Sequence, residues 1–134
     1  MATLIDSSLW VDYFRPKTPA PIRQQVAQWV DSADAAVCEP IRFEILRAVP
    51  RADRIRVEQV FATLPVLPTP KEIWARATAL GQACADAGIQ PRSMDLLIAA
   101  VCLHYDEALV TFDSDFAQIG TIRPLKVRLL VRGG

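Results

Sequence analysis

The sequence predicts a single α/β domain with a mainly parallel central sheet of about five short strands, flanked by helices. Short apolar runs alternate along the chain with longer segments whose apolar residues recur at helical spacing. This alternation is typical of a parallel sheet covered on both faces. The chain has 134 residues, of which 51% are hydrophobic and 22% charged. That size suffices for one core without disulfides or a structural metal, so we expect residues 1–134 to form one domain.

In the first half of the chain, polar residues or prolines mark the helix starts and short apolar runs mark the strands. A strand at 2–5 is followed by the helix-start signature Asp6-Ser7-Ser8, and that helix closes at Arg15-Pro16. A second helix begins near Pro21, and a buried strand occupies 35–38. Pro40 lies in the first turn of the next helix, and a further helix covers 52–64. A short strand within 65–68 is expected near a sheet edge because prolines flank it.

The second half continues the same alternation. A long helix over 70–87 is stopped by Gly88, and Ser93 can cap a helix that runs to about Tyr105. A strand at 108–111, a short helix over 113–119 closed by Gly120, and a last strand at 125–130 complete the chain. In such sheets ligands collect beyond the carboxyl ends of the strands, where the strand order reverses.

Composition excludes several classes of function. Lys plus Arg and Asp plus Glu each number 15, so any RNA or DNA contact needs a local basic patch. The three cysteines lie in apolar stretches, which predicts buried, reduced thiols in a cytoplasmic protein. A zinc site is not expected, since there is no Cys-x-x-Cys pair and only one histidine. The chain start does not resemble a signal peptide, and the longest apolar run, 96–103, is far shorter than the ~20 residues of a membrane span.

Four carboxylates stand where an apolar α/β chain does not favour them. Asp6 and Asp113 follow the carboxyl ends of two expected strands, and Asp95 opens the apolar run 96–103. Glu44 shares one helical stripe with Ile41, Ile45 and Ala48 and therefore faces inward. A charge beside a core must be paired, neutralised or bound to a metal. No Lys or Arg is placed to pair all four acids, so the pattern indicates a site for a hard divalent cation and phosphate chemistry.

Each acid also has an ordinary structural explanation. Asp6 can cap the following helix, and Glu44 can pair with a distant arginine. Asp95 is favoured in the first turn of its helix by the helix dipole. Asp113 and Asp115 flank Ser114, and one of the two can belong to a polar turn only.

Four segments together resemble one known family. They are Leu4-Ile-Asp-Ser-Ser-Leu-Trp10, Cys38-Glu-Pro-Ile-Arg-Phe-Glu-Ile-Leu46, Asp95-Leu-Leu-Ile-Ala-Ala100 and Val110-Thr-Phe-Asp-Ser-Asp-Phe116. In this order and spacing they resemble the PIN-domain ribonucleases, in particular the VapC-type toxins of bacterial type II toxin–antitoxin pairs. The resemblance covers nearly the whole chain and implies a single PIN-like domain. Phe112 stands where the family usually has a basic or polar residue.

The resemblance also implies roles for individual residues. It makes Asp6, Glu44, Asp95 and Asp113 the catalytic quartet, with Mg²⁺ or Mn²⁺ held by Asp6, Asp95 and Asp113. Asp115 is implied as an accessory acid, and Ser7 and Thr111 as hydrogen-bonding groups within the site. The candidate phosphate contacts share a positive charge, which ordinary surface residues also carry: Arg15, Lys17, Arg42, Arg47 and Arg92.

The implied activity is endonucleolytic cleavage of RNA, often tRNA or ribosomal RNA, leaving a 5′-phosphate and a 3′-hydroxyl. The implied partners are a small cognate antitoxin protein and a second copy of the chain. We expect exposed aromatic side chains on the early helices to contribute to one of these surfaces: Trp10, Tyr13, Phe14 and Trp29.

Two alternatives belong to other functional classes. Another acid-cluster phosphohydrolase meets the same electrostatics, but a haloacid-dehalogenase-like site needs a second Asp two residues after Asp6, where Ser8 stands. A catalytically silent PIN-fold module that only binds RNA or protein has no need to keep all four acids, and all four are present. The P-loop, the Gly-x-Gly-x-x-Gly loop and the Gly-x-Ser-x-Gly elbow are absent.

Overall fold

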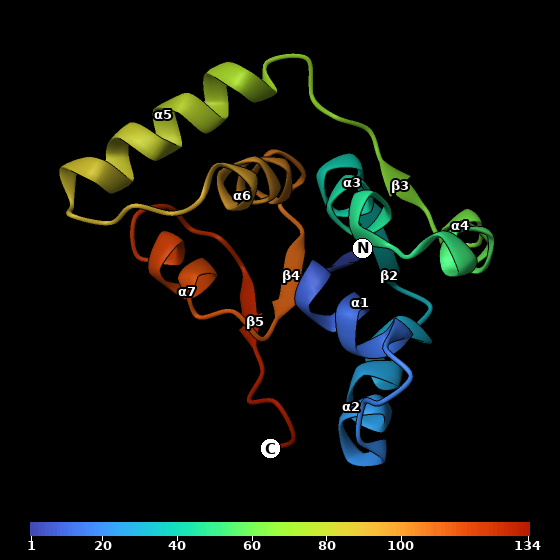
Figure 1. The fold of residues 1–134 in the computed structure, drawn as a ribbon. Helices are drawn as coiled ribbons and strands as arrows, with labels where there is room; N and C mark the ends of the chain where they lie inside the picture. Colours follow the sequence, from blue (N-terminus) through green and yellow to red (C-terminus); the bar gives the residue numbers. More distant parts are fainter.

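The fold is built on a five-stranded, all-parallel sheet in the order β3-β2-β1-β4-β5 (Figure 1). The computed structural model describes all residues 1–134. The strands are β1 (Thr3–Ile5), β2 (Ala35–Cys38), β3 (Val66–Leu67), β4 (Ala108–Thr111) and β5 (Val127–Leu129). The chain builds outward from β1 to β2 and β3, then crosses to the other side of β1 for β4 and β5. The strand order therefore reverses between β1 and β4, which is where a parallel sheet opens a crevice for a ligand.

Seven α-helices connect and cover the strands. They are α1 (Ser7–Phe14), α2 (Ala20–Val30), α3 (Glu39–Ala48), α4 (Arg54–Ala62), α5 (Ile73–Asp86), α6 (Ser93–Tyr105) and α7 (Asp115–Gly120). Helix α5 packs against α6 on one side of the molecule, whereas α1 packs against α2 and α3 on another (Figure 1). No helix is both long and apolar enough to cross a membrane.

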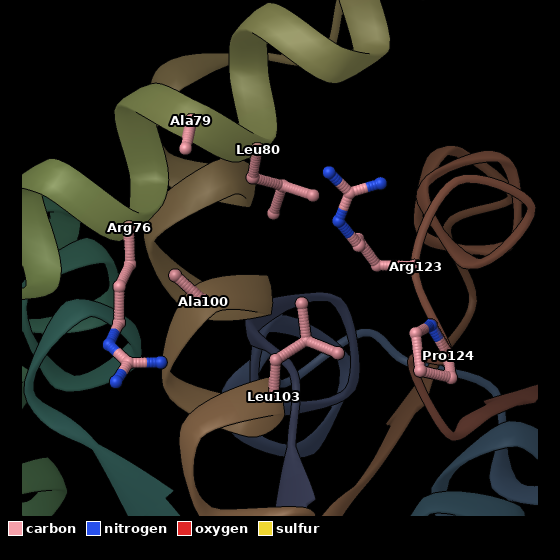
Figure 2. A pocket seen from close by; sticks show the side chains of 7 residues that line it. All are labelled: Arg76, Ala79, Leu80, Ala100, Leu103, Arg123 and Pro124. Atoms are coloured by element: carbon pink, nitrogen blue, oxygen red, sulfur yellow. The ribbon is translucent and has the colours of Figure 1, made fainter.

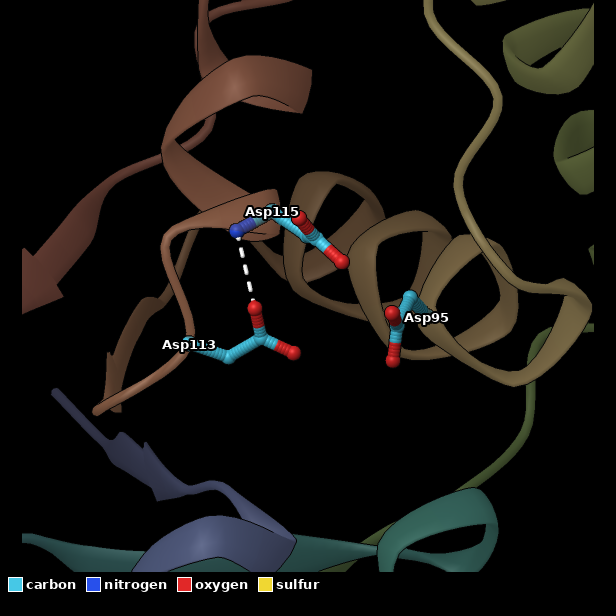
Figure 3. A group of neighbouring side chains, drawn as sticks. All are labelled: Asp95, Asp113 and Asp115. Carbon is cyan, nitrogen blue, oxygen red and sulfur yellow. Dashed lines mark hydrogen bonds between the residues drawn. The ribbon is translucent and has the colours of Figure 1, made fainter.

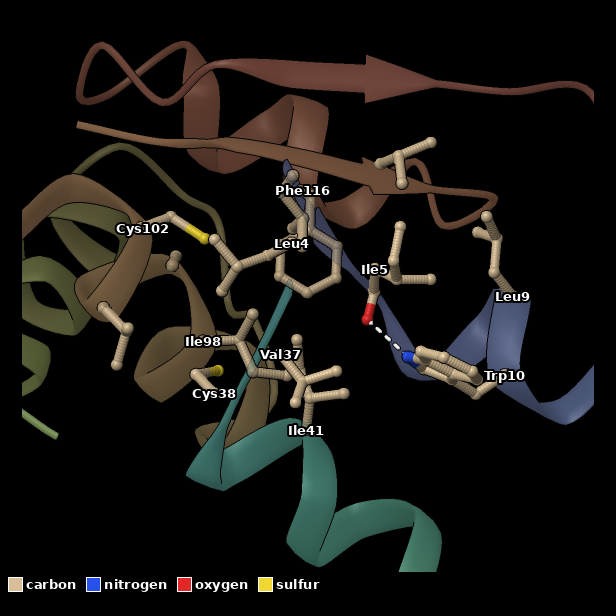
Figure 4. Packing of buried hydrophobic residues seen from close by; sticks show 14 of the residues in the cluster. Leu4, Ile5, Leu9, Trp10, Val37, Cys38, Ile41, Ile98, Cys102 and Phe116 are labelled. Carbon is tan, nitrogen blue, oxygen red and sulfur yellow. Dashed lines mark hydrogen bonds between the residues drawn. The ribbon is translucent and has the colours of Figure 1, made fainter. Parts of the chain in front are cut away.

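The core forms where the apolar strands meet the inward faces of α1, α3 and α6 (Figure 4). All four residues of β2 are buried, and α6 contributes the continuous buried run 98–102. Trp10 is fully buried, donates its indole N–H to the carbonyl oxygen of Ile5 at 3.0 Å and packs edge-on against Phe61. The expectation that Trp10 is exposed is therefore wrong, because this side chain is part of the core.

The expected elements are present, with differences at their ends. The strand between prolines lies at the sheet edge, as predicted, and the three cysteines are buried free thiols. Gly88, with φ of +80°, follows α5 where a left-handed residue is needed. The helix expected over 52–64 is divided into a 3-10 turn, Arg51–Asp53, and α4. Ser93 does not cap α6, since it is the first helical residue and Arg92 holds the cap position without a side-chain hydrogen bond.

Candidate active site

Asp6 stands at the carboxyl end of β1, where it caps α1. Its side chain is nearly buried, with 4% of the residue exposed. Three donors converge on Oδ2: the Ser8 backbone N–H at 3.3 Å, the Ser8 hydroxyl at 2.8 Å and the Thr111 hydroxyl at 2.8 Å. Burial raises the pKa of Asp6, and the hydroxyl and backbone donors oppose that rise by stabilising the carboxylate. Asp6 therefore both caps α1 and lies in the candidate site.

Two hydroxyl groups tie the segment after β4 to the segment after β1. The hydroxyl oxygen of Thr111, besides donating to Asp6, accepts a hydrogen bond from the backbone N–H of Asp113 at 2.9 Å. The hydroxyl oxygen of Ser8 accepts from the backbone N–H of Phe112 at 3.1 Å. These bonds hold Asp113 near Asp6, although the two residues are far apart in sequence. The sequence did not identify Ser8 as a residue of the site. Its position two residues after Asp6, within reach of that carboxylate, was the available signal.

Glu44 enters the site from α3. The Ser7 hydroxyl donates to its Oε1 at 2.6 Å, which joins the first turn of α1 to the middle of α3. Glu44 is half-buried and forms no ion pair with any Lys or Arg of the chain. Glu44 therefore does not pair with a distant arginine. Its contact with Ser7 agrees with the inward placement expected from the helical stripe.

Asp95, Asp113 and Asp115 form a group in which one oxygen from each lies within 4.8 Å of the others (Figure 3). Asp95 lies in the first turn of α6 with 2% of the residue exposed, and Asp113 follows β4. The backbone N–H of Asp115 donates to Asp113 Oδ1 at 2.9 Å, so α7 begins at Asp115 rather than at 113. Burial, aided by the charges of Asp113 and Asp6, raises the pKa of Asp95 to about 6 against the opposing effect of Arg92.

Arg92 pairs with two of these acids, so the cluster has a basic partner, although no Lys or Arg pairs with all four. Its Nε lies 3.3 Å from Asp95 Oδ2, and its Nη2 lies 3.2 Å from Asp113 Oδ2. The negative charge and hydrogen bond of Asp95 are the main reasons that the pKa of Arg92 is raised. The pairing of Arg92 with Asp113 could not be predicted from the local sequence, because the two residues are 21 positions apart.

The structure thus places the four expected catalytic acids around the ends of β1 and β4, with two differences in detail. Asp115, expected as an accessory acid, belongs to the closest group of three carboxylates. Asp6, expected as a metal ligand, lies outside that group and is engaged by Ser8 and Thr111.

The five expected phosphate contacts are distributed unevenly. Arg92 lies within the acid cluster, and Arg15 lines a groove of about 460 Å³ that also contains Ser7 and Glu44. Lys17 and Arg47 are exposed and form no ion pair. Arg42 is half-buried, and its buried Nε has no hydrogen-bond partner.

A separate hollow of about 280 Å³ lies between α5, α6 and the segment after α7 (Figure 2). Apolar side chains line it together with Arg76 and Arg123. None of the candidate acids lines this hollow, so it is not part of the site.

Comparison with known proteins identifies the class. The sequence profile described as the PIN domain matches residues 3–122. The chain therefore belongs to the PIN-domain family. The VapC ribonuclease Mb1587 of Mycobacterium bovis and the ribonuclease VapC11 of Mycobacterium tuberculosis are each 35% identical to this chain over 129 residues, covering 92% of this chain and 95% of the relative.

Solved structures support the same fold. VapBC2 of Rickettsia felis, bound to a promoter DNA fragment, contains a chain with a TM-score of 0.75 and 15% identity, covering 97% of this chain and 99% of that one. A chain of VapBC-1 from nontypeable Haemophilus influenzae has a TM-score of 0.73 and 18% identity, covering 96% and 98%. At these identities the likeness concerns the fold.

Proposed function

We propose that this chain is a metal-dependent endoribonuclease that acts as the toxin of a toxin–antitoxin pair and cleaves structured RNA such as tRNA or ribosomal RNA. The observation that carries the proposal is the convergence of Asp6, Glu44, Asp95 and Asp113 at the reversal of strand order. The ribonuclease names of relatives that are 35% identical over nearly the whole chain support it.

The donor set fits a hard divalent cation. Asp95, Asp113 and Asp115 offer only carboxylate oxygens within 4.8 Å of one another, and Mg²⁺ and Mn²⁺ prefer oxygen ligands. Asp95 and Asp113, together with Asp6 or Asp115, would hold the ion. When bound, it supplies water activation and charge neutralisation at the scissile phosphate.

The remaining polar groups orient and hold the reacting species. Because Ser7 holds Glu44 through Oε1, the other carboxylate oxygen is available to orient the attacking water and accept its proton. Ser8 and Thr111 donate hydrogen bonds that favour the anionic form of Asp6, which opposes the rise in its pKa caused by burial. Arg15, exposed in the groove beside Ser7 and Glu44, is placed to contact an RNA phosphate.

The proposal includes partners. Solved structures with this fold are named as toxin–antitoxin complexes, which supports a small antitoxin and a hetero-oligomer for this chain, in addition to a homodimer. An antitoxin arginine entering the acid cluster suits paired carboxylates, because the guanidinium fork matches their geometry. A cytoplasmic location belongs to the proposal, because the three cysteines are buried free thiols.

The proposal is tested by incubating purified protein with total RNA and mapping new 5′-phosphate ends. We expect cleavage with Mg²⁺ or Mn²⁺ and none with EDTA. Asp6→Asn and Asp95→Asn are expected to remove cleavage while circular dichroism remains that of the wild type. Full activity in either variant would contradict the assignment of the site.

Other outcomes with the wild-type protein would favour the alternative functions. RNA that is bound but never cut would favour a silent binding module, and hydrolysis of phosphate monoesters without RNA cleavage would favour another phosphohydrolase. In cells, we expect expression of the chain alone to be toxic, with relief by an adjacent small reading frame. Toxicity that persists in Asp6→Asn would show that the harm does not come from this site.

A further inference from the structure

Arg92 occupies the same carboxylate groups that the proposed metal ion needs. Its two contacts go to Asp95 Oδ2 and Asp113 Oδ2, and both residues belong to the group of three acids described above. We propose that Arg92 is a displaceable counter-ion, which neutralises Asp95 and Asp113 before the metal binds and is displaced from them by the metal. This inference rests on the proposed metal site and adds a competing group within the chain itself.

A guanidinium group and a divalent cation compete for these carboxylates. Arginine has donors only and stays protonated, so it cannot become a metal ligand, and its charge repels the ion. Metal binding therefore gains the attraction between the ion and the two carboxylates, but it costs the protein the ion pairs that Arg92 makes with them. The net affinity of the site for the ion is lower than the three acids alone would give.

The geometry of Arg92 is that of a group that can move. Its side chain is 71% exposed, each of its two contacts goes to a different carboxylate, and it makes no other hydrogen bond. The chain offers a contrast in Arg132, which binds both oxygens of Asp12 at 2.8 Å through Nε and Nη2. Longer contacts on an exposed side chain are weakly held, so displacement of Arg92 is inexpensive compared with breaking the Arg132 pair.

After displacement, Arg92 remains beside the site because its backbone lies only three residues before Asp95 at the start of α6. A free guanidinium fork suits an RNA phosphate. For Arg92, that phosphate is a better partner than a carboxylate that is already bound to metal. Removing Arg92 is therefore expected to act with opposite signs, strengthening the binding of the metal and weakening the binding of the RNA. A side chain that only supports the fold would weaken both.

The test is a Mn²⁺ titration of the intact protein by calorimetry, or by the paramagnetic resonance signal of free Mn²⁺, without RNA. We expect Arg92→Gln to bind Mn²⁺ about 3- to 10-fold more tightly than the wild type, the size of effect that its two ion pairs produce together. Arg92→Lys keeps the charge and is expected to stay near the wild-type affinity. Arg76→Gln is the matched control, since Arg76 is exposed on α5 and has no carboxylate partner.

Two further readouts separate competition from a structural role. In EDTA, Arg92→Gln is expected to melt below the wild type, and the difference should shrink at saturating Mn²⁺. In the cleavage assay, Arg92→Gln should need less Mn²⁺ for half-maximal rate while its KM for RNA rises. Unchanged or weaker Mn²⁺ binding in Arg92→Gln, with normal binding in the wild type, would overturn the counter-ion inference alone. A wild-type protein that binds no Mn²⁺ would instead overturn the metal site on which the proposed function depends.

Discussion

Replacing Asp95 with asparagine is expected to stabilise the metal-free protein at neutral pH. Asp95 is almost fully buried, and burial is the main reason that its pKa rises from 3.8 to about 6. Each pKa unit corresponds to about 1.36 kcal/mol, so ionising this carboxylate in the folded state costs up to about 3 kcal/mol above pH 6. Asparagine has nearly the same shape as the protonated acid and avoids this cost.

The sign of the pH dependence follows from the raised pKa. Above about pH 6 the folded protein bears the full cost of the ionised Asp95, and as the pH falls from about 6 towards 3.8 the native state takes up a proton that the unfolded chain does not yet bind. The advantage of Asp95→Asn should therefore be largest at neutral pH and disappear in acid. The pKa of about 6 already includes the opposing effect of Arg92, so we expect a gain of about 1–3 kcal/mol at pH 7.5.

The assay is thermal unfolding in EDTA at several pH values between 7.5 and 4.5. For a chain of this size the gain raises Tm by roughly 4–12 °C at pH 7.5. Glu58→Gln is the control, since Glu58 is exposed and forms no ion pair. Mn²⁺ should then raise the Tm of the wild type and not that of Asp95→Asn. The reasoning about buried charge would be refuted if Asp95→Asn were no more stable than the wild type at pH 7.5. It would also be refuted if the advantage of the variant over the wild type were as large at pH 4.5 as at pH 7.5.

Three other outcomes are expected. Thr111→Val removes a donor to Asp6 and raises the pKa of that acid further, so the acidic limb of the pH–rate profile should move to higher pH; an unmoved limb would contradict this role. Trp10→Phe leaves the buried carbonyl of Ile5 without its donor and should lower the free energy of unfolding by about 1–3 kcal/mol in urea titrations, whereas Trp74→Phe, at a site 71% exposed, should have little effect. All three cysteine thiols should resist a water-soluble thiol reagent until the protein unfolds, and rapid labelling of the native protein would show that they are not buried as described.

Much of the fold is determined by local patterns. Short apolar runs, helical spacing and terminating residues such as Gly88 depend on near neighbours in sequence, and these elements form where they were expected. The position of Asp6 after a strand, and of Glu44 on an apolar stripe, also follows from local periodicity. Asp6 lies in the site because the carboxyl ends of parallel strands share one edge of the sheet, whereas Glu44 reaches it because α3 packs against α1.

Other features depend on contacts between distant segments. Trp10 is buried because Ile5 and Phe61 enclose it, and Ser8 joins the site because the segment after β4 supplies the N–H of Phe112. The sequence presented Arg92 as a candidate phosphate contact or an ordinary surface charge, and its ion pairs with Asp95 and Asp113 appeared only in the tertiary structure. The sequence by itself determined which residue types stand at the ends of strands and helices, whereas the tertiary structure decided their partners, since a hydrogen bond or ion pair is set by distance in space rather than along the chain.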